Sequence, residues 1–159
     1  MQAMSTSLGA RLPARLVARL ALEADAGDDQ AVLLATLDPA GQPHPALLTP
    51  ADILALGPAA LRLAVAAGSR TADNLRQRGA LTLCFLLPGS AHYVKARATE
   101  LEGGLPDHPR LAAFQAQVQD VLEDHPLPAT EGHAELVSGI TFRKPAPAGP
   151  PVRRSLEQL

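Results

Sequence analysis

The sequence predicts a mainly β fold with flanking helices, in which six antiparallel strands close, or nearly close, into a barrel. Six short apolar segments follow one another within about 110 residues, a spacing typical of barrels and sandwiches. Most of the connections are tight turns, which favour antiparallel pairing. The chain has 159 residues, of which 47% are hydrophobic and 19% charged. This is the size and composition of one globular domain.

An amphipathic helix is expected within residues 1–27. Its arginines and leucines each recur every four residues, on neighbouring stripes: Arg11, Arg15, Arg19 and Leu8, Leu12, Leu16, Leu20. An Arg-rich start that lacks acidic residues is also typical of an organelle transit peptide. We favour an ordinary surface helix and keep the transit peptide as the alternative.

The expected strands cover residues 31–37, 44–56, 61–67, 80–87, 92–101 and 133–144. Pro39 and Gly41 predict a type I turn after the first strand. Pro50 interrupts the second strand and predicts a bulge or a sheet edge there, because proline donates no ladder hydrogen bond. A short helix is expected after Ser69, which is a good N-cap, and Gly79 closes it.

The helix with the clearest pattern is expected over residues 108–126, and Pro126 ends it. Five large apolar residues have helical spacing there: Leu111, Phe114, Val118, Val121 and Leu122. The chain is thus divided into an N-terminal helix (1–27), a barrel domain (28–145) and a Pro-rich tail (146–159). We expect the tail to be extended.

The composition excludes several classes of protein. The net charge of −2 and the pI near 6.2 argue against a nucleic-acid binder, and no apolar run has the roughly 20 residues that span a bilayer. The single Cys84 forms no internal disulfide, and we expect it to be a small core residue in a cytoplasmic protein. The five histidines show no zinc-site spacing, so no metal site is expected.

The best candidate anion site is Ser69-Arg70-Thr71. The free N–H groups at a helix start, two hydroxyls and a guanidinium suit a phosphate, and Asn74 lies one turn further on the same side. The competing interpretation is that Ser69 merely caps the helix while Arg70 is solvated.

Three segments carry a family resemblance: AVLLATLDPAGQPHPALL, LRLAVAAGSRTADNLRQRGALTLCF and HYVKARATEL. In this order they resemble the pyridoxamine 5′-phosphate oxidase-like FMN-binding split barrels, over roughly half of the chain. The resemblance implies a six-stranded antiparallel split β-barrel and a homodimer that holds FMN in clefts between its subunits. It places the phosphate at Ser69, Arg70 and Thr71, with Asn74 as a further candidate. It also places the flavin ring and ribityl chain beside Leu47, Leu48, Thr49, Val65 and Tyr93.

Two departures from the family pattern bear on function. Thr71 stands where the family commonly has lysine, and loss of that cation weakens phosphate binding by about 1 kcal/mol or more. The chain also lacks tryptophan, whereas the true oxidase reads its substrate with a Trp-containing C-terminal segment, so oxidation of pyridoxamine phosphate is not expected. We therefore expect an FMN-dependent oxidoreductase that acts on an unidentified small molecule, with no catalytic residue assigned. The alternatives are a split barrel without flavin that serves as a binding or scaffold protein, and a reductase that uses the deazaflavin F420.

Overall fold

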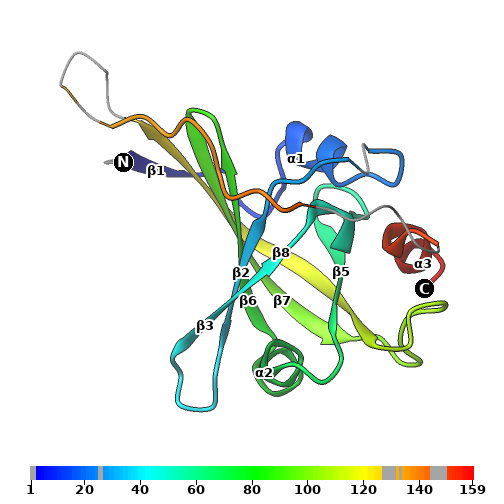
Figure 1. Cartoon of the computed structure of the whole chain (residues 1–159). Coiled ribbons are helices and arrows are strands. Elements are labelled where there is room, and N and C mark those ends of the chain that lie inside the picture. Colours follow the sequence, from blue (N-terminus) through cyan, green and yellow to red (C-terminus); the bar gives the residue numbers. More distant parts are fainter. Residues whose placement is uncertain (1–2, 25–26, 127–131, 133, 144–149) are drawn as a thin grey trace.

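The protein is a strongly curled antiparallel sheet, seen in a computed structural model that describes residues 3–24, 27–126, 132, 134–143 and 150–159 (Figure 1). The strands in this part of the chain are β1 (Ala3–Ser7), β2 (Val32–Leu37), β3 (Pro43–Leu48), β4 (Ile53–Ala55), β5 (Ala60–Ala66), β6 (Ala80–Leu87), β7 (Ser90–Glu100) and β8 (Leu111–Pro126). Their order in the sheet is β3-β2-β6-β7-β8-β5-β4, and β1 pairs with the distal part of β8. The mainly β, antiparallel fold expected from the sequence is confirmed.

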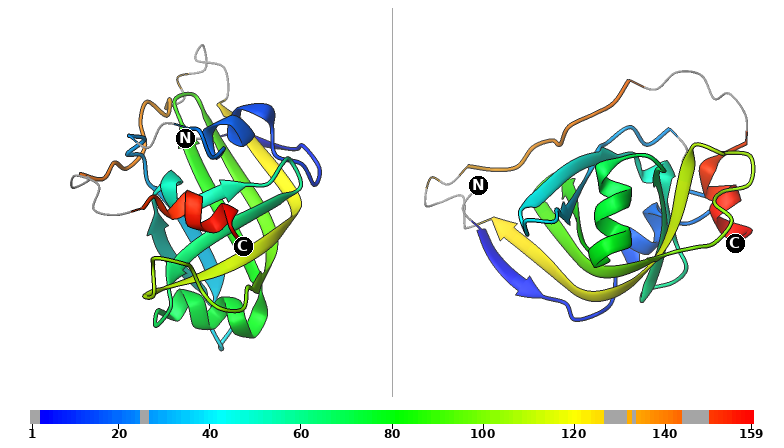
Figure 2. Two further views of the ribbon diagram at one scale, coloured as in Figure 1. Left: turned by 90° about the vertical axis from the view of Figure 1, so that its right-hand side faces the viewer. Right: turned by 90° about the horizontal axis from the view of Figure 1, so that it is seen from below.

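In the described ranges, four short helices accompany the sheet: α1 (Ala14–Arg19), the 3₁₀ turn η1 (Pro50–Asp52), α2 (Arg70–Arg78) and α3 (Val152–Glu157). Viewed from below, α2 lies across the lower opening of the curled sheet (Figure 2, right). α3 packs against η1, β4 and β5. α2 therefore covers the lower end of the sheet and α3 covers one side of it, while β3 lies at an edge of the sheet.

The inner face of the sheet forms the core. Along β2 and β6 buried and partly exposed residues alternate, because successive side chains of a strand point to opposite faces. Phe85 and Phe114 are the largest fully buried side chains. Leu16 and Leu20, from α1 and its C-cap, belong to the same core cluster.

Four expected strands and one expected helix are confirmed. β2, β5, β6 and β7 lie within a residue or two of their predicted bounds, and α2 begins after Ser69 and ends before Gly79. The turn after β2 is also formed, with the amide nitrogen of Gly41 donating to the carbonyl oxygen of Asp38.

The expected helix over residues 108–126 is wrong, because the segment forms the 16-residue strand β8. β8 pairs with β7 along one edge and with β5 and β1 along the other. Ladder hydrogen bonds on both sides outweigh the helical spacing of the large apolar residues.

The expected second strand, 44–56, is two strands with different partners. β3 pairs with β2, then Pro50 begins η1, and β4 pairs with β5 at the far end of the sheet order. The proline predicted to disturb the strand therefore marks the crossing from one sheet edge to the other.

The expected sixth strand, 133–144, is wrong for residues 134–143, the part that the structure describes. This segment makes an isolated bridge between Thr141 and Gln30 and no ladder. Within the tail, α3 contradicts the extended conformation expected for residues 152–157. The N-terminal helix is shorter than expected and follows β1. The domain divisions at residues 27 and 145 stay predictions.

Candidate functional site

The start of α2 is fixed by its own sequence. The Ser69 Oγ accepts a hydrogen bond from the Ala72 amide nitrogen (3.1 Å) and donates to the Ala66 carbonyl oxygen (2.7 Å). At the other end, Gly79 has a φ of 71°, and a Cβ there would lie 2.8 Å from the Ala98 carbonyl oxygen. Glycine is needed at that position both for the left-handed conformation and for the close approach to β7.

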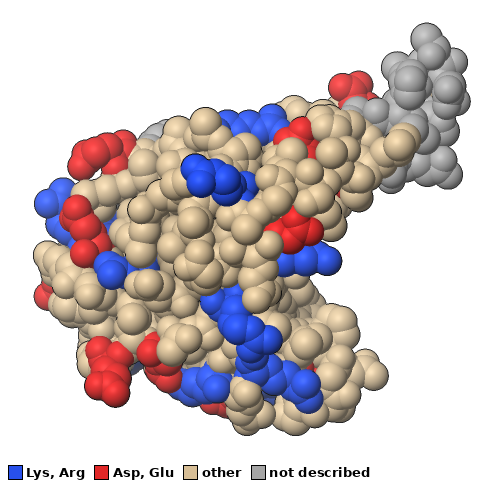
Figure 3. Space-filling model, turned by 180° about the vertical axis from the view of Figure 1, so that it is seen from behind, with Lys and Arg blue, Asp and Glu red and all other residues tan. Residues whose placement is uncertain are grey.

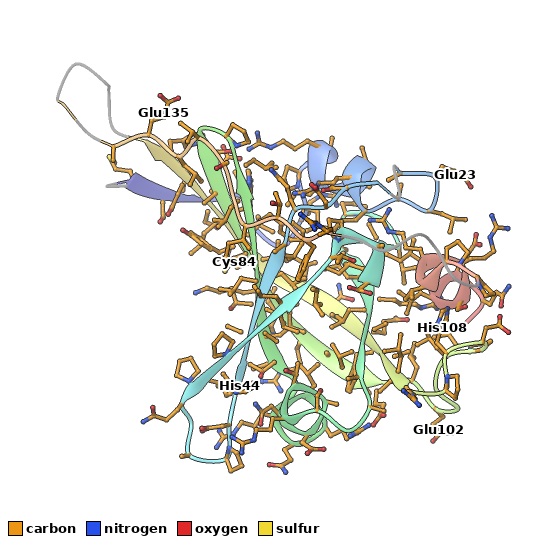
Figure 4. All side chains as sticks on the ribbon, in the orientation of Figure 1. Glu23, His44, Cys84, Glu102, His108 and Glu135 are labelled. Carbon is orange, nitrogen blue, oxygen red and sulfur yellow. The ribbon has the colours of Figure 1, made fainter. Side chains whose placement is uncertain are left out.

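A cavity of about 300 Å³ lies between α2 and the β2–β3 hairpin. This is the lower end of the usual range for small-ligand pockets. Its lining residues are Asp38, Pro39, His44, Arg70, Asp73, Asn74 and Gln77. Figure 4 shows His44 near the lower end of β3, on the side where α2 lies.

Two donors of this cavity are the residues predicted from the sequence, Arg70 and Asn74. The Arg70 side chain is exposed and has no hydrogen-bond or ion-pair partner within the described residues. Asn74 is only 4% exposed, and its Nδ2 donates to the Thr36 Oγ1 (3.0 Å). The Thr36 Oγ1 donates in turn to the His44 carbonyl oxygen (3.5 Å), which links α2 to both strands of the hairpin.

Two carboxylates also line the cavity, and each has a local partner. The Asp38 Oδ1 accepts from the Gln42 amide nitrogen (2.8 Å) across the hairpin turn. The Asp73 Oδ1 accepts from the Arg76 Nη1 (3.1 Å). Neither carboxylate neutralises Arg70, so this guanidinium keeps its charge available to a ligand.

The structure separates the other predicted residues from this cavity. Thr71 is 4% exposed and does not line it, while Leu48 and Val65 belong to the core cluster. The Thr49 amide nitrogen and Oγ1 both donate to the Asp52 Oδ2 (2.8 and 2.9 Å). Thr49 is thereby committed to the start of η1.

Leu47 and Tyr93, the last two predicted residues, lie on the outer face of the sheet. The strand register places five residues in one row across β3, β2, β6, β7 and β8: Leu47, Leu33, Cys84, Tyr93 and Leu122. Burial, followed by a hydrogen bond to Asp124, raises the pKa of Tyr93 to about 12. Burial also raises the pKa of the Cys84 thiol, which suits a packing role better than a nucleophile.

Beside this row the outer face carries a second cavity of about 310 Å³, lined by Ala35, Thr36, Leu37, Pro43, Ala80, Leu81, Thr82, Lys95, Ala96 and Gln119. Lys95 and Arg97 are both exposed on this face, as their alternation in the sequence implies. Figure 3 shows a run of Lys and Arg side chains from the middle to the lower edge of the molecule when it is seen from behind.

Sequence analysis missed three functional or structural features. His44 was not assigned, although its place in the hairpin puts it opposite α2. Arg153 of α3 is 5% exposed and hydrogen-bonded to four main-chain carbonyls, which no local pattern indicates. A cluster around the buried His92 also depends on residues that are distant in sequence, namely Arg15 and Glu123.

Within the described residues no group of three or more His, Cys, Asp or Glu side chains is arranged to hold a metal ion. The same part of the chain contains no helix with the length and apolar character needed to cross a membrane.

Comparison with known proteins gives a fold and no close sequence relative. No family model matches the chain, and no curated protein matches it. Among solved structures, a candidate pyridoxamine 5′-phosphate oxidase from Lactobacillus delbrueckii superposes with a TM-score of 0.54 at 17% identity, over 76% of this chain and 98% of that one. An FMN-binding protein from Syntrophomonas wolfei gives a TM-score of 0.52 at 15% identity, over 69% of this chain and 86% of that one.

A haem-binding protein from Mycobacterium smegmatis gives a TM-score of 0.50 at 18% identity, over 69% of this chain and 53% of that chain. Proteins that share this architecture therefore bind different ligands, and the architecture alone does not select one. The chain has the split-barrel fold of the pyridoxamine 5′-phosphate oxidase-like, FMN-binding proteins.

Proposed function

We propose that the chain binds FMN with the phosphate at the N-terminal corner of α2, and that it is an FMN-dependent oxidoreductase acting on a small molecule. The observation that carries the proposal is Arg70, a guanidinium without a partner in the described residues at the mouth of a cavity. The amide groups that begin α2 add a favourable dipole for an anion. Arg70 and Asn74, which line the cavity, are the proposed phosphate ligands, and Ser69 caps the helix that carries them.

The edge position of β3 supports the rest of the cofactor assignment. One row of main-chain groups on an edge strand has no strand partner, and among the described strands β3 pairs with β2 alone. The strand leads from His44 at the cavity to Leu48, roughly 13 Å further at the usual rise per residue. An elongated ligand anchored at α2 therefore has the backbone of Leu47–Thr49 within reach.

When bound, FMN supplies the redox chemistry of the reaction. The chain's own residues bind and orient the cofactor: Arg70 and Asn74 hold the phosphate end, and the edge of β3 receives the ring. Within the described residues the cavity at α2 contains no nucleophile paired with a base, which is compatible with a protein that relies on its cofactor for reactivity.

We also propose a homodimer, formed through the outer face of the sheet. The row from Leu47 to Leu122 presents apolar side chains to solvent in one chain, and Leu47 is 43% exposed. Such a row is stabilised when a second copy covers it. Leu47→Glu should give a monomeric mass in light scattering at micromolar concentration. Leu56→Glu, at an equally exposed leucine outside this row, should remain dimeric, and a monomeric wild-type protein would contradict the proposed interface.

A flavin-free binding or scaffold protein is the second candidate function. Two observations favour it: Asp38 and Asp73 face the cavity at α2, and the Ser69 hydroxyl is already engaged by the helix cap. The F420-dependent reductase remains the third possibility, since the same corner suits the phosphate of a deazaflavin.

Spectroscopy and titration of the purified full-length chain test these candidates. We expect flavin absorption bands in the purified protein, and quenching of FMN fluorescence when FMN is added to protein stripped of cofactor. Riboflavin, which lacks the phosphate, should bind about tenfold or more weakly if the phosphate meets a charged donor. Colourless protein that takes up neither FMN nor F420 would contradict the proposal and support the flavin-free candidate.

A further inference from the structure

We propose that His44 recognises the phosphate group together with Arg70, closing the cavity from the side of β3; this inference rests on the proposed function. His44 and Arg70 belong to different elements, separated by 26 positions in the sequence, and both line the same cavity. Neither side chain has a partner within the described residues. Side chains from two different elements can reach a phosphate from two directions, and a phosphate accepts hydrogen bonds from several directions.

The position of His44 is held by the hairpin and by α2 together. Its carbonyl oxygen accepts from the Thr36 Oγ1, and that hydroxyl accepts from the Asn74 Nδ2. Thr36 and Asn74 are both more than nine-tenths buried. The main chain of His44 is thereby fixed relative to α2, while the imidazole makes no hydrogen bond within the described chain.

Asn74 has one amide hydrogen left for a ligand. Its amide uses one donor on Thr36 and makes no other side-chain hydrogen bond within the described residues. A buried amide normally satisfies more of its hydrogen-bonding groups. Because Asn74 lines the cavity, a bound oxygen acceptor would take its remaining amide hydrogen.

The charges of the cavity give a second donor a clear role. Asp38 and Asp73 both line it, and although each has a local partner, their charges oppose that of an anion held by Arg70. Thr71 adds no donor, since it does not reach the cavity. A histidine ring nitrogen that carries hydrogen can donate to a phosphate oxygen.

The test compares the affinities of FMN and riboflavin in the full-length chain, so that the phosphate contribution is isolated. His44→Gln should lower the affinity for FMN about tenfold, as for loss of one hydrogen bond to a charged group, and leave riboflavin unchanged. His44→Lys should retain the preference for FMN, because lysine is also a hydrogen-bond donor. His125→Gln is the matched control, since His125 contacts Glu123 and does not line the cavity.

The outcomes separate this inference from the proposed function. If the wild type prefers FMN and His44→Gln keeps the same preference, the inference is overturned and the proposed function stands. If the wild type binds neither flavin, or binds both equally, the phosphate site itself is overturned.

A second measurement needs no substitution. In histidine-labelled wild-type protein, adding inorganic phosphate should shift the NMR signals of the His44 ring and leave those of His125 in place. Equal shifts at both rings, or none, would overturn the inference.

Discussion

Arg153 and Arg70 show two opposite uses of a guanidinium in one small molecule. Arg153 lies in the first turn of the short C-terminal helix α3 and is buried. It donates to four carbonyl oxygens that lie 100 or more positions away in sequence: those of Arg19, Ala21, Pro50 and Ile53. Arg70 begins α2, is exposed, and faces a cavity without a partner in the described residues. The two side chains have the same chemistry and different surroundings.

The difference indicates which arginine belongs to the fold and which is available for a ligand. A buried guanidinium needs acceptors for its N–H groups. Arg153 donates to carbonyl oxygens at the end of α1, in η1 and in β4, and so connects these three segments. An arginine left without acceptors at a cavity mouth contributes little to stability and retains its capacity to bind an anion. The comparison predicts opposite results from the same substitution.

The largest effect is expected from Arg153→Ala. Removing the guanidinium takes a donor from four carbonyl groups, of which those of Ile53 and Pro50 make buried hydrogen bonds to it. A buried polar group that loses its partner costs roughly 1–3 kcal/mol. We expect the free energy of unfolding, measured by urea denaturation, to fall by about 3 kcal/mol or more. Arg154→Ala, at the exposed neighbouring position, should change it by less than about 0.5 kcal/mol. Equal effects of the two variants would contradict the role assigned to Arg153.

Arg70→Ala should give the reverse pattern. The free energy of unfolding should change by less than about 0.5 kcal/mol, because Arg70 loses no partner in the described residues. The affinity for FMN should fall by about 1.5–3 kcal/mol, as for loss of a hydrogen bond to a charged group. Isothermal titration with FMN measures the second quantity, and an unchanged dissociation constant would remove Arg70 from the site.

A third arginine, Arg15, shares its Nη2 among Ser90, His92 and Glu123. Its Nη2 lies 2.6 Å from the His92 Nε2 and 3.0 Å from the Glu123 Oε2, while the same His92 Nε2 lies 2.5 Å from the Glu123 Oε2. Burial lowers the pKa of the fully buried His92, the hydrogen bond to Glu123 opposes this, and the charges of Arg15 and His125 lower it further. For Glu123, burial raises the pKa, but the His92 contact and the neighbouring charges outweigh it and the net direction is downward.

These directions predict a loss of stability in mild acid. His92 has a lowered pKa in the folded state, so the unfolded chain takes up the proton first as the pH falls below about 6.5. The free energy of unfolding should therefore decrease between pH 7 and pH 5, by at most about 1.4 kcal/mol per pH unit. Urea denaturation at several pH values measures it, and His92→Gln should flatten the dependence. The same slope in both proteins would contradict the assignment to His92.

The smallest effect is expected from Ser69→Ala. Loss of the cap hydrogen bond to Ala72 should lower the free energy of unfolding by about 1 kcal/mol. Since the hydroxyl is engaged within the protein, the loss of FMN affinity should be smaller than for Arg70→Ala. A loss of FMN affinity larger than that of Arg70→Ala would mean that the Ser69 hydroxyl binds the ligand. Ser69 would then belong to the binding site and not only to the helix cap.

The corner at α2 was predictable from the sequence because its determinants are local. Ser69 caps, Gly79 adopts the left-handed conformation, and the strands before and after the helix are short apolar runs. Arg70 and Asn74 follow from this register, since a helix places residues four apart on one side. His44 did not follow, because its approach to α2 depends on how the hairpin curls over the sheet.

β8 was not predicted because its sequence satisfies two periods. Phe114 and Val118 have helical spacing, yet Gln115, Gln117 and Gln119 alternate with Ala116 and Val118, which is the period of a strand. The alternating glutamines are the signal that would have indicated a strand with one polar face. Pairing with the neighbouring strands β5 and β7 selects the strand conformation, and these strands are distant from β8 in the sequence.

The sequence by itself determined the strands β2, β5, β6 and β7, the bounds of α2 and the guanidinium at its start, because each depends on residues within a few positions of one another. Tertiary structure alone decided that residues 111–126 extend, that the Arg153 guanidinium is hydrogen-bonded within the fold, and that His44 and Arg70 line the same cavity. Those outcomes depend on which backbone groups and charges are brought together by the closing of the sheet, and no short stretch of sequence contains that information.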